Sequence, residues 1–211
     1  RWSRSERVVN GEALLCVKSP VRLLPVGGVA MMARSVFLFG ALWLVLASAC
    51  DQGEGVVRGD ALALSDCDEG GVWSPFEMEL VYLSVLRASD AVVMRASVTP
   101  ELPDVSDSLT ITIASYDDVM AALDADGVAV LTLDSGAVSL GLTLLASCPE
   151  STTPLVGSSG SLTLYEFGTH TGDRVRGDLS FQLENARTGE AVGSGFEGAI
   201  DFEILAGPPY E

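Results

Sequence analysis

The sequence predicts an all-β protein, an antiparallel β-sandwich or barrel-like fold of about eight strands with at most one short helix. Two observations carry this prediction. Apolar and polar residues alternate with a period of two over several stretches, and turn-forming residues separate those stretches. Such alternation places one face of each strand in a core and the other in water, which is typical of antiparallel sheets.

Eight stretches are predicted as strands. Four alternate clearly, namely residues 109–113, 138–144, 179–183 and 196–204. Four more lie between turn signals, namely residues 76–86, 91–98, 128–133 and 162–167. A short helix is predicted at residues 117–123, with Ser115 or Asp117 as its N-cap and Gly127 beyond its end. The Pro-containing residues 99–108 and the Ser-, Thr- and Gly-rich residues 149–161 are predicted as loops.

The chain before the strands has the layout of an export signal. Arg34 precedes an apolar run over residues 36–47, and small residues follow at 47–49. This run is within the roughly 7–15 residues of a signal-peptide core and short of the roughly 20 that span a bilayer. Residues 31–49 are therefore predicted to be a cleaved signal helix.

The end of this segment resembles a known family. Leu46-Ala47-Ser48-Ala49-Cys50 is similar to the lipobox of bacterial lipoproteins. That resemblance implies that Cys50 receives a thioether-linked diacylglycerol and becomes the mature N-terminus. The family usually has Leu three places before the cysteine, where this chain has Ala47. Residues 47–49 also match an ordinary signal-peptidase site, so a secreted soluble form is the alternative.

The remaining boundaries follow from that cut. Residues 1–30 contain no methionine and precede Met31 and Met32. We interpret them as disordered sequence translated from too far upstream, with an unusually long positive region of the signal as the alternative. The polar, Gly-rich residues 50–60 are predicted to be a lipidated flexible tether, and residues 61–211 a single β-sandwich domain. Residues 172–204 also resemble the terminal hairpin of uncharacterised exported β-sandwich lipoproteins, which supports the fold class.

Cleavage before Cys50 leaves a strongly acidic chain. It contains 27 acidic residues, six arginines and no lysine, and hence has a net charge of −21 with histidine neutral. Nucleic acid is excluded as a partner, because phosphate binding needs a clustered basic face. An anionic bilayer repels such a domain, so membrane contact is predicted through the lipid anchor alone. The charge favours either solubility or binding of a divalent cation.

Cysteine usage predicts one crosslink. With Cys50 acylated and Cys16 upstream of the cut, Cys67 and Cys148 remain, and export to an oxidising compartment favours a disulfide between them. Two free buried thiols are the alternative. Two cysteines and His170 fall short of the four ligands of a zinc site. Asp124 and Asp126 are weak calcium candidates, since the other ligands of a complete calcium loop are missing. No cofactor is predicted.

The sequence contains no complete catalytic motif. His170, the one histidine, lies in a polar turn, and neither a G-x-S-x-G elbow nor a phosphate-binding Gly-Lys sequence occurs. We therefore predict a lipid-anchored envelope protein, on the exported side of a bacterial membrane, with a non-enzymatic binding or structural β domain. Its partner would be an envelope protein or a polysaccharide. The alternatives are a hydrolase that uses paired carboxylates and a calcium-dependent adhesion module.

Overall fold

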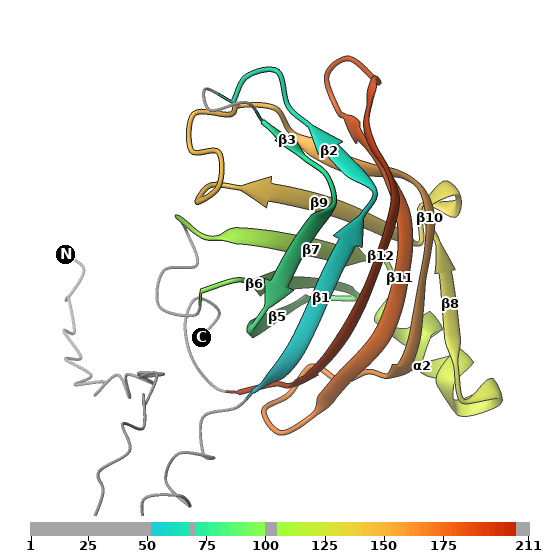
Figure 1. The fold of residues 1–211 in the computed structure, drawn as a ribbon. Helices are drawn as coiled ribbons and strands as arrows, with labels where there is room; N and C mark the ends of the chain where they lie inside the picture. Colours follow the sequence, from blue (N-terminus) through green and yellow to red (C-terminus); the bar gives the residue numbers. More distant parts are fainter. Residues whose placement is uncertain (1–51, 68–70, 100–104, 206–211) are drawn as a thin grey trace, which may run out of the picture. The chain divides into compact units, whose positions relative to one another are not determined.

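The computed structural model describes residues 52–67, 71–99 and 105–205, which fold as antiparallel strands with one α-helix (Figure 1). The predictions for residues 1–30, for the signal segment 31–49 and for Cys50 lie outside the described residues. The strands in chain order are β1 (Gly53–Gly59), β2 (Ala61–Ala63), β3 (Val72–Trp73), β4 (Phe76–Leu80), β5 (Tyr82–Ala88), β6 (Ala91–Ser97), β7 (Asp107–Ile113), β8 (Ala129–Thr132), β9 (Val138–Leu144), β10 (Leu155–Glu166), β11 (Arg174–Asn185) and β12 (Ala191–Glu203). The all-β prediction is confirmed.

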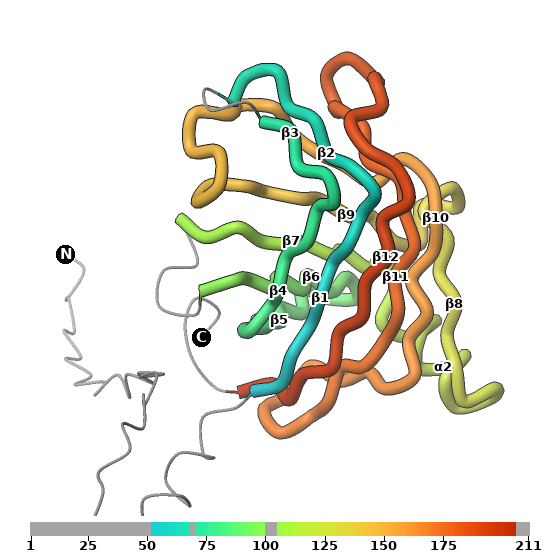
Figure 2. The backbone as a smooth tube through the Cα atoms, in the orientation of Figure 1, coloured from blue at the N-terminus to red at the C-terminus, as the bar shows by residue number. Residues whose placement is uncertain are grey.

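All strands belong to one antiparallel sheet that is curved and unclosed (Figure 2). Its hydrogen-bonded order is β3-β2-β12-β11-β10-β9-β7-β6-β5, with β1 paired to β12 and to β4. β4 and β5 are separated by Val81 alone, yet β4 pairs with β1 while β5 pairs with β6. The curvature therefore wraps the inner face of the sheet around one hydrophobic core.

Inward-facing side chains fill that core as the alternation predicts. In β11 every second residue is buried from Val175 to Leu183. Phe196 of β12 stacks on Phe181 with ring centroids 5.4 Å apart, and its ring lies edge-on to Phe76 of β4 at 5.6 Å. Aromatic pairs of this kind add roughly 0.5–1.5 kcal/mol beyond the burial of their area.

The prediction of a flexible tether over residues 50–60 is wrong where the structure describes it, because Gly53–Gly59 is β1, with a neighbour on each side. Glycine is needed at these positions of β1 because neighbouring aromatic rings leave no room for a Cβ. A Cβ on Gly59 would lie 2.7 Å from the Phe196 ring, and one on Gly55 would lie 3.0 Å from the Phe202 ring. Large aromatic rings cross the strand where it has no side chains, so a composition typical of a linker forms a central strand.

Gln52, the residue before β1, makes strand-like hydrogen bonds through its side chain. Gln52 is 5% exposed, and its amide Nε2 donates to the Leu83 carbonyl (2.6 Å) while its Oε1 accepts from the Leu83 N–H (3.1 Å). Its backbone carbonyl accepts from the N–H of Glu203 (2.7 Å). Gln52 therefore joins β12 to β5 by imitating a strand residue.

Replacing Gln52 with Glu is expected to destabilise the fold by about 2–3 kcal/mol, because a carboxylate cannot donate to the Leu83 carbonyl and becomes a buried charge. Urea denaturation at pH 7 measures the change. Gln182→Glu on the exposed face of β11 is the matched control and should stay within about 0.5 kcal/mol of the native protein. Equal effects of the two substitutions would contradict a structural role for the Gln52 amide.

The predicted helix is confirmed and is longer than expected. α2 spans Tyr116–Asp126, the Ser115 hydroxyl accepts from the N–H of Asp118 (3.3 Å), and Gly127 ends the helix with φ of 70°. After β8, the short 3-10 helix η2 (Leu133–Ser135) leads into β9. β8 pairs with the second half of β10, whereas β9 pairs with β10 only near its start.

The loop predicted over residues 149–161 ends earlier than expected, because β10 begins at Leu155. Gly160 has φ of 127°, and a Cβ on it would lie 2.0 Å from the Ser180 carbonyl oxygen of β11. Gly157 likewise leaves room for Leu133 of η2. These glycines allow close contact with neighbouring elements, so a Ser- and Gly-rich stretch is a strand inside the sheet.

Candidate functional site

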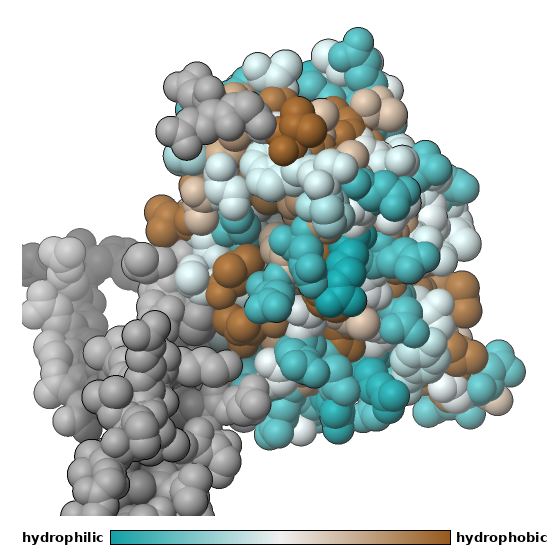
Figure 3. Space-filling view, in the orientation of Figure 1, coloured by the Kyte–Doolittle hydropathy of each residue, from teal (hydrophilic) through white to brown (hydrophobic). Residues whose placement is uncertain are grey.

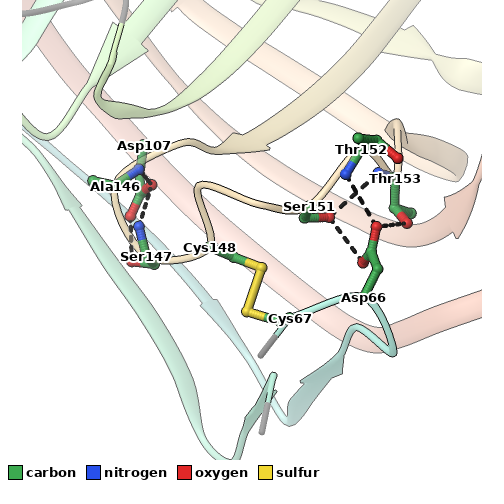
Figure 4. The surroundings of a disulfide bond; sticks show 9 residues. All are labelled: Asp66, Cys67, Asp107, Ala146, Ser147, Cys148, Ser151, Thr152 and Thr153. Carbon is green, nitrogen blue, oxygen red and sulfur yellow. Dashed lines mark hydrogen bonds between the residues drawn. A yellow bond between two sulfur atoms is a disulfide. The ribbon is translucent and has the colours of Figure 1, made fainter. Parts of the chain in front are cut away.

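The cysteines lie at the end of the sheet opposite the start of β1, which we call the disulfide end. Cys67 is in the loop between β2 and β3, Cys148 is in the loop between β9 and β10, and their Cα atoms are 5.6 Å apart (Figure 4). This separation suits a disulfide. The structure thus brings together the two residues that the sequence predicts as partners.

Asp66 precedes Cys67 in the loop between β2 and β3, and its carboxylate holds the loop between β9 and β10. It accepts from the Ser151 hydroxyl (2.9 Å), the Thr152 N–H (3.0 Å) and the Thr153 hydroxyl (2.8 Å). The hydrogen bond from Thr153 is the largest cause that holds the pKa of Asp66 below its ordinary value of 3.8, and burial opposes it. The ionised form of Asp66 is therefore the one that the fold stabilises.

Asp66→Asn is expected to lower the stability at pH 7 by about 1–3 kcal/mol, because an amide cannot accept all three hydrogen bonds. A lowered pKa stabilises the fold above the unfolded-state pKa, and this contribution disappears as the pH falls through the folded-state pKa. The difference between the native protein and the variant should therefore shrink below pH 3.8. Thermal melts from pH 7 to pH 2 measure it, with exposed Asp134→Asn as the control. A difference independent of pH would refute the role of the Asp66 charge.

A second carboxylate holds the other side of the loop. Asp107, at the start of β7, is buried and accepts from the N–H groups of Ala146 (2.8 Å) and Ser147 (3.1 Å) and from the Ser147 hydroxyl. Figure 4 shows Asp107 and Asp66 on opposite sides of Cys148. The loop between β9 and β10 is therefore fixed at three points by two carboxylates and the cysteine pair.

A small cavity of about 160 Å³ lies under this loop. Its lining is Leu64, Leu142, Thr143, Leu144, Leu145, Cys148, Ser151, Thr152, Thr153, Pro154 and Leu155. Ligand pockets of roughly 300–1,000 Å³ are usual for drug-sized molecules, so this mostly apolar cavity has room only for a small group. Among the described residues that line it there is neither a carboxylate nor a histidine, the groups that general acid–base catalysis uses most.

The structure does not bring the weak calcium candidates together. Asp124 and Asp126 lie in the last turn of α2, two positions apart. Successive residues of an α-helix are rotated by about 100°, so these two side chains point away from each other. Within the part of the chain that the structure describes, Cys67, Cys148 and Glu150 place possible ligand atoms within 4.8 Å of one another, and the pairing of the two cysteines explains this group.

His170 lies in the loop between β10 and β11, far along the sheet from the disulfide end. Its side chain is 79% exposed, with Nδ1 3.4 Å from an Asp173 carboxylate oxygen. Asp173 also accepts from the N–H groups of Thr169 (3.0 Å) and His170 (2.9 Å), which lower its pKa, the one from His170 most. These hydrogen bonds order the turn, and the exposed His170 is a solvated loop residue within it.

The exposed apolar side chains are distributed over the sheet. Trp73 of β3 packs edge-on against Phe76 at 6.5 Å, while Tyr165 of β10 donates its hydroxyl to Asp178 (2.7 Å), which raises the tyrosine pKa. Among the residues that the structure describes, the exposed large apolar ones come from seven different strands or loops, namely Val72, Val81, Leu86, Val105, Val130, Tyr165 and Leu205. On the face shown in Figure 3, polar side chains separate the hydrophobic ones.

Comparison with known proteins finds no matching family model, no matching curated protein and no matching solved structure. Of the helices in the described residues, none has the length and apolarity needed to cross a membrane. Sequence reasoning missed the roles of Asp66 and Asp107 in holding the loop between β9 and β10, since a carboxylate that binds a distant loop leaves no local signal in the sequence.

Proposed function

We propose that this chain is an exported envelope protein, anchored to a bacterial membrane by a diacylglycerol on Cys50, with a non-enzymatic binding or structural domain. The observation that carries the proposal is the start of the fold. The folded unit begins at Gln52, two residues after the cysteine that the lipobox resemblance selects. Only a short stretch of chain would therefore lie between the proposed lipid and the described sheet, which suits a domain held by an N-terminal anchor.

The cysteine pair supports the same compartment. A disulfide between Cys67 and Cys148 closes a separation of 81 residues and is stable in the oxidising space outside the cytoplasm. The large excess of carboxylates keeps such a domain soluble and away from anionic surfaces. Anchoring through the lipid then holds in place a domain whose own charge does not attract it to the membrane.

The disulfide end is the region we assign to binding. Its loop is fixed by Asp66, Asp107 and the cysteine pair, and it covers the small apolar cavity. A rigid loop over an apolar recess suits a small aliphatic or aromatic group carried by an envelope protein or polysaccharide. The hydrolase and calcium alternatives have no comparable observation in their favour.

Cys50→Ala is expected to move the protein from the membrane fraction of its native host to the soluble exported fraction, because the thioether anchor cannot form. Membrane sedimentation and immunoblotting measure the distribution, and Cys16→Ala, upstream of the predicted cut, serves as the control that should change nothing. Native protein in the soluble fraction would favour ordinary secretion and would overturn the anchor.

A further inference from the structure

The start of β1 also determines how an anchored domain is oriented. We propose that the end of the sheet at which β1 begins rests on the bilayer headgroups, so that the disulfide end faces away from the membrane. This inference rests on the proposed acylation of Cys50. It replaces the long flexible tether that the sequence predicted with an anchor held close to the fold.

The first step is the length of chain between the lipid and the fold. Gln52 is buried and held by three hydrogen bonds, to Glu203 and to both backbone groups of Leu83. One residue, Asp51, lies between it and Cys50, and a fully extended chain spans about 3.6 Å per residue, so two positions along the chain hold the Cα atoms of Cys50 and Gln52 within about 7 Å. The headgroup layer of one leaflet is roughly 5–8 Å thick. Gln52 must therefore stay at the membrane surface.

The second step is which residues surround Gln52. Glu203 continues into Ile204, whose N–H donates to the Asp173 carbonyl (2.8 Å), while the Gly172 N–H donates to the Ile204 carbonyl (2.8 Å). These bonds tie the loop of residues 167–173 to the same end of the sheet. Figure 1 shows the start of β1, the end of β12 and this loop together at the lower end of the sheet.

The third step is the chemistry that this end presents. The Asp173 carboxylate accepts hydrogen bonds within its own loop, and Asp201 is bound by both Nε and Nη2 of Arg174 (2.6 and 2.8 Å). Leu205 is 44% exposed and the His170 side chain is 79% exposed. Glu54, Glu166 and Glu203 lie exposed at the same end, so the lipid anchor, and not electrostatic attraction, holds this end at the bilayer surface.

The fourth step is the distance to the other end. β11 has 12 residues, and a strand rises about 3.4 Å per residue, so the loop of residues 167–173 and the hairpin of residues 186–190 are separated by about 35–40 Å. The cysteine pair and the cavity are at the far end with that hairpin, since the Ala186 N–H donates to the Pro154 carbonyl (2.9 Å). The anchored domain thus presents its candidate binding region away from the bilayer.

Tryptophan quenching tests the orientation. Trp2 and Trp43 precede Cys50, so the processed protein contains Trp73 alone. In a Trp73→Phe background, we would place one probe at exposed Thr171 and a matched probe at exposed Ala186. Each lipid-modified protein is purified from host membranes and reconstituted into phosphatidylcholine vesicles that carry a nitroxide on the headgroup. We expect quenching of Thr171→Trp to exceed that of Ala186→Trp at least threefold.

The outcomes separate the two proposals. Equal quenching of the two probes, or stronger quenching of Ala186→Trp, in protein that floats with the vesicles would overturn the orientation and leave the anchor intact. Native protein that does not float with the vesicles would overturn both. The Cys50→Ala variant of each probe, added to the same vesicles, should show no quenching, which excludes contact by simple diffusion.

Discussion

Gly160→Ala is expected to destabilise the fold by about 4 kcal/mol or more. The new methyl group would lie 2.0 Å from the Ser180 carbonyl oxygen and 2.7 Å from the Phe181 Cα. Both are backbone atoms of β11, so no side chain can move to relieve the overlap and the two strands must separate. A φ of 127° adds strain for any residue with a Cβ. Urea denaturation, with circular dichroism as the probe, measures the loss.

Gly189→Ala is the matched control, because it isolates backbone strain from steric overlap. Gly189 also has a positive φ, of 70°, but a Cβ there meets no atom within 4 Å. We expect a loss of about 1 kcal/mol at this position. If Gly160→Ala cost no more than Gly189→Ala, β10 and β11 would not approach as closely as the structure places them.

Removing the cysteine pair is expected to cost about 4 kcal/mol. The crosslink closes a separation of 81 residues, and the chain-entropy model assigns a loss of this size to the larger freedom of the uncrosslinked unfolded chain. The double variant Cys67→Ala, Cys148→Ala should also make the loop between β9 and β10 more sensitive to proteolysis. Denaturation of the native protein with and without a reductant gives a second measurement of the same loss.

The control for this experiment is reduction of the double variant, which should change nothing. If reduction left the native protein as stable as before, the two thiols would be free, which is the alternative that the cysteine count left open. The Asp66 and Asp107 hydrogen bonds remain in the variant, so the fold should persist with a lower melting temperature.

Features with a local signal could be predicted from the sequence. The alternation in residues 138–144 and 179–183 identified β9 and part of β11, because each strand buries one face. Gly127 was identified as the residue beyond the helix end, and Ser115, the N-cap, was one of the two candidates together with Asp117, since the ends of a helix need these residue types. Cys67 and Cys148 were paired by elimination and compartment, without any knowledge of the fold.

Features that depend on a distant partner could not be predicted. Glycines in β1 and β10 resemble a linker until Phe196, Phe202 and the β11 backbone are seen against them. The Gln52 amide pairs with Leu83, which is 31 residues away, and Asp107 binds a loop about 40 residues away. Contacts with a distant partner leave no periodic pattern in the sequence. The tether over residues 50–60 and the end of the loop over residues 149–161 were therefore predicted incorrectly.

The short stretch of chain between Cys50 and Gln52 connects the described fold to the proposed function, and one measurement tests that connection most directly. Intact-mass analysis of the protein purified from its native host reports the N-terminus, the lipid and the cysteine pair together. Our account predicts the mass of residues 50–211 plus a diacylglyceryl group, less two hydrogens for the disulfide. An unmodified chain that begins at Cys50 would contradict the anchor, and with it the proposed orientation of the domain.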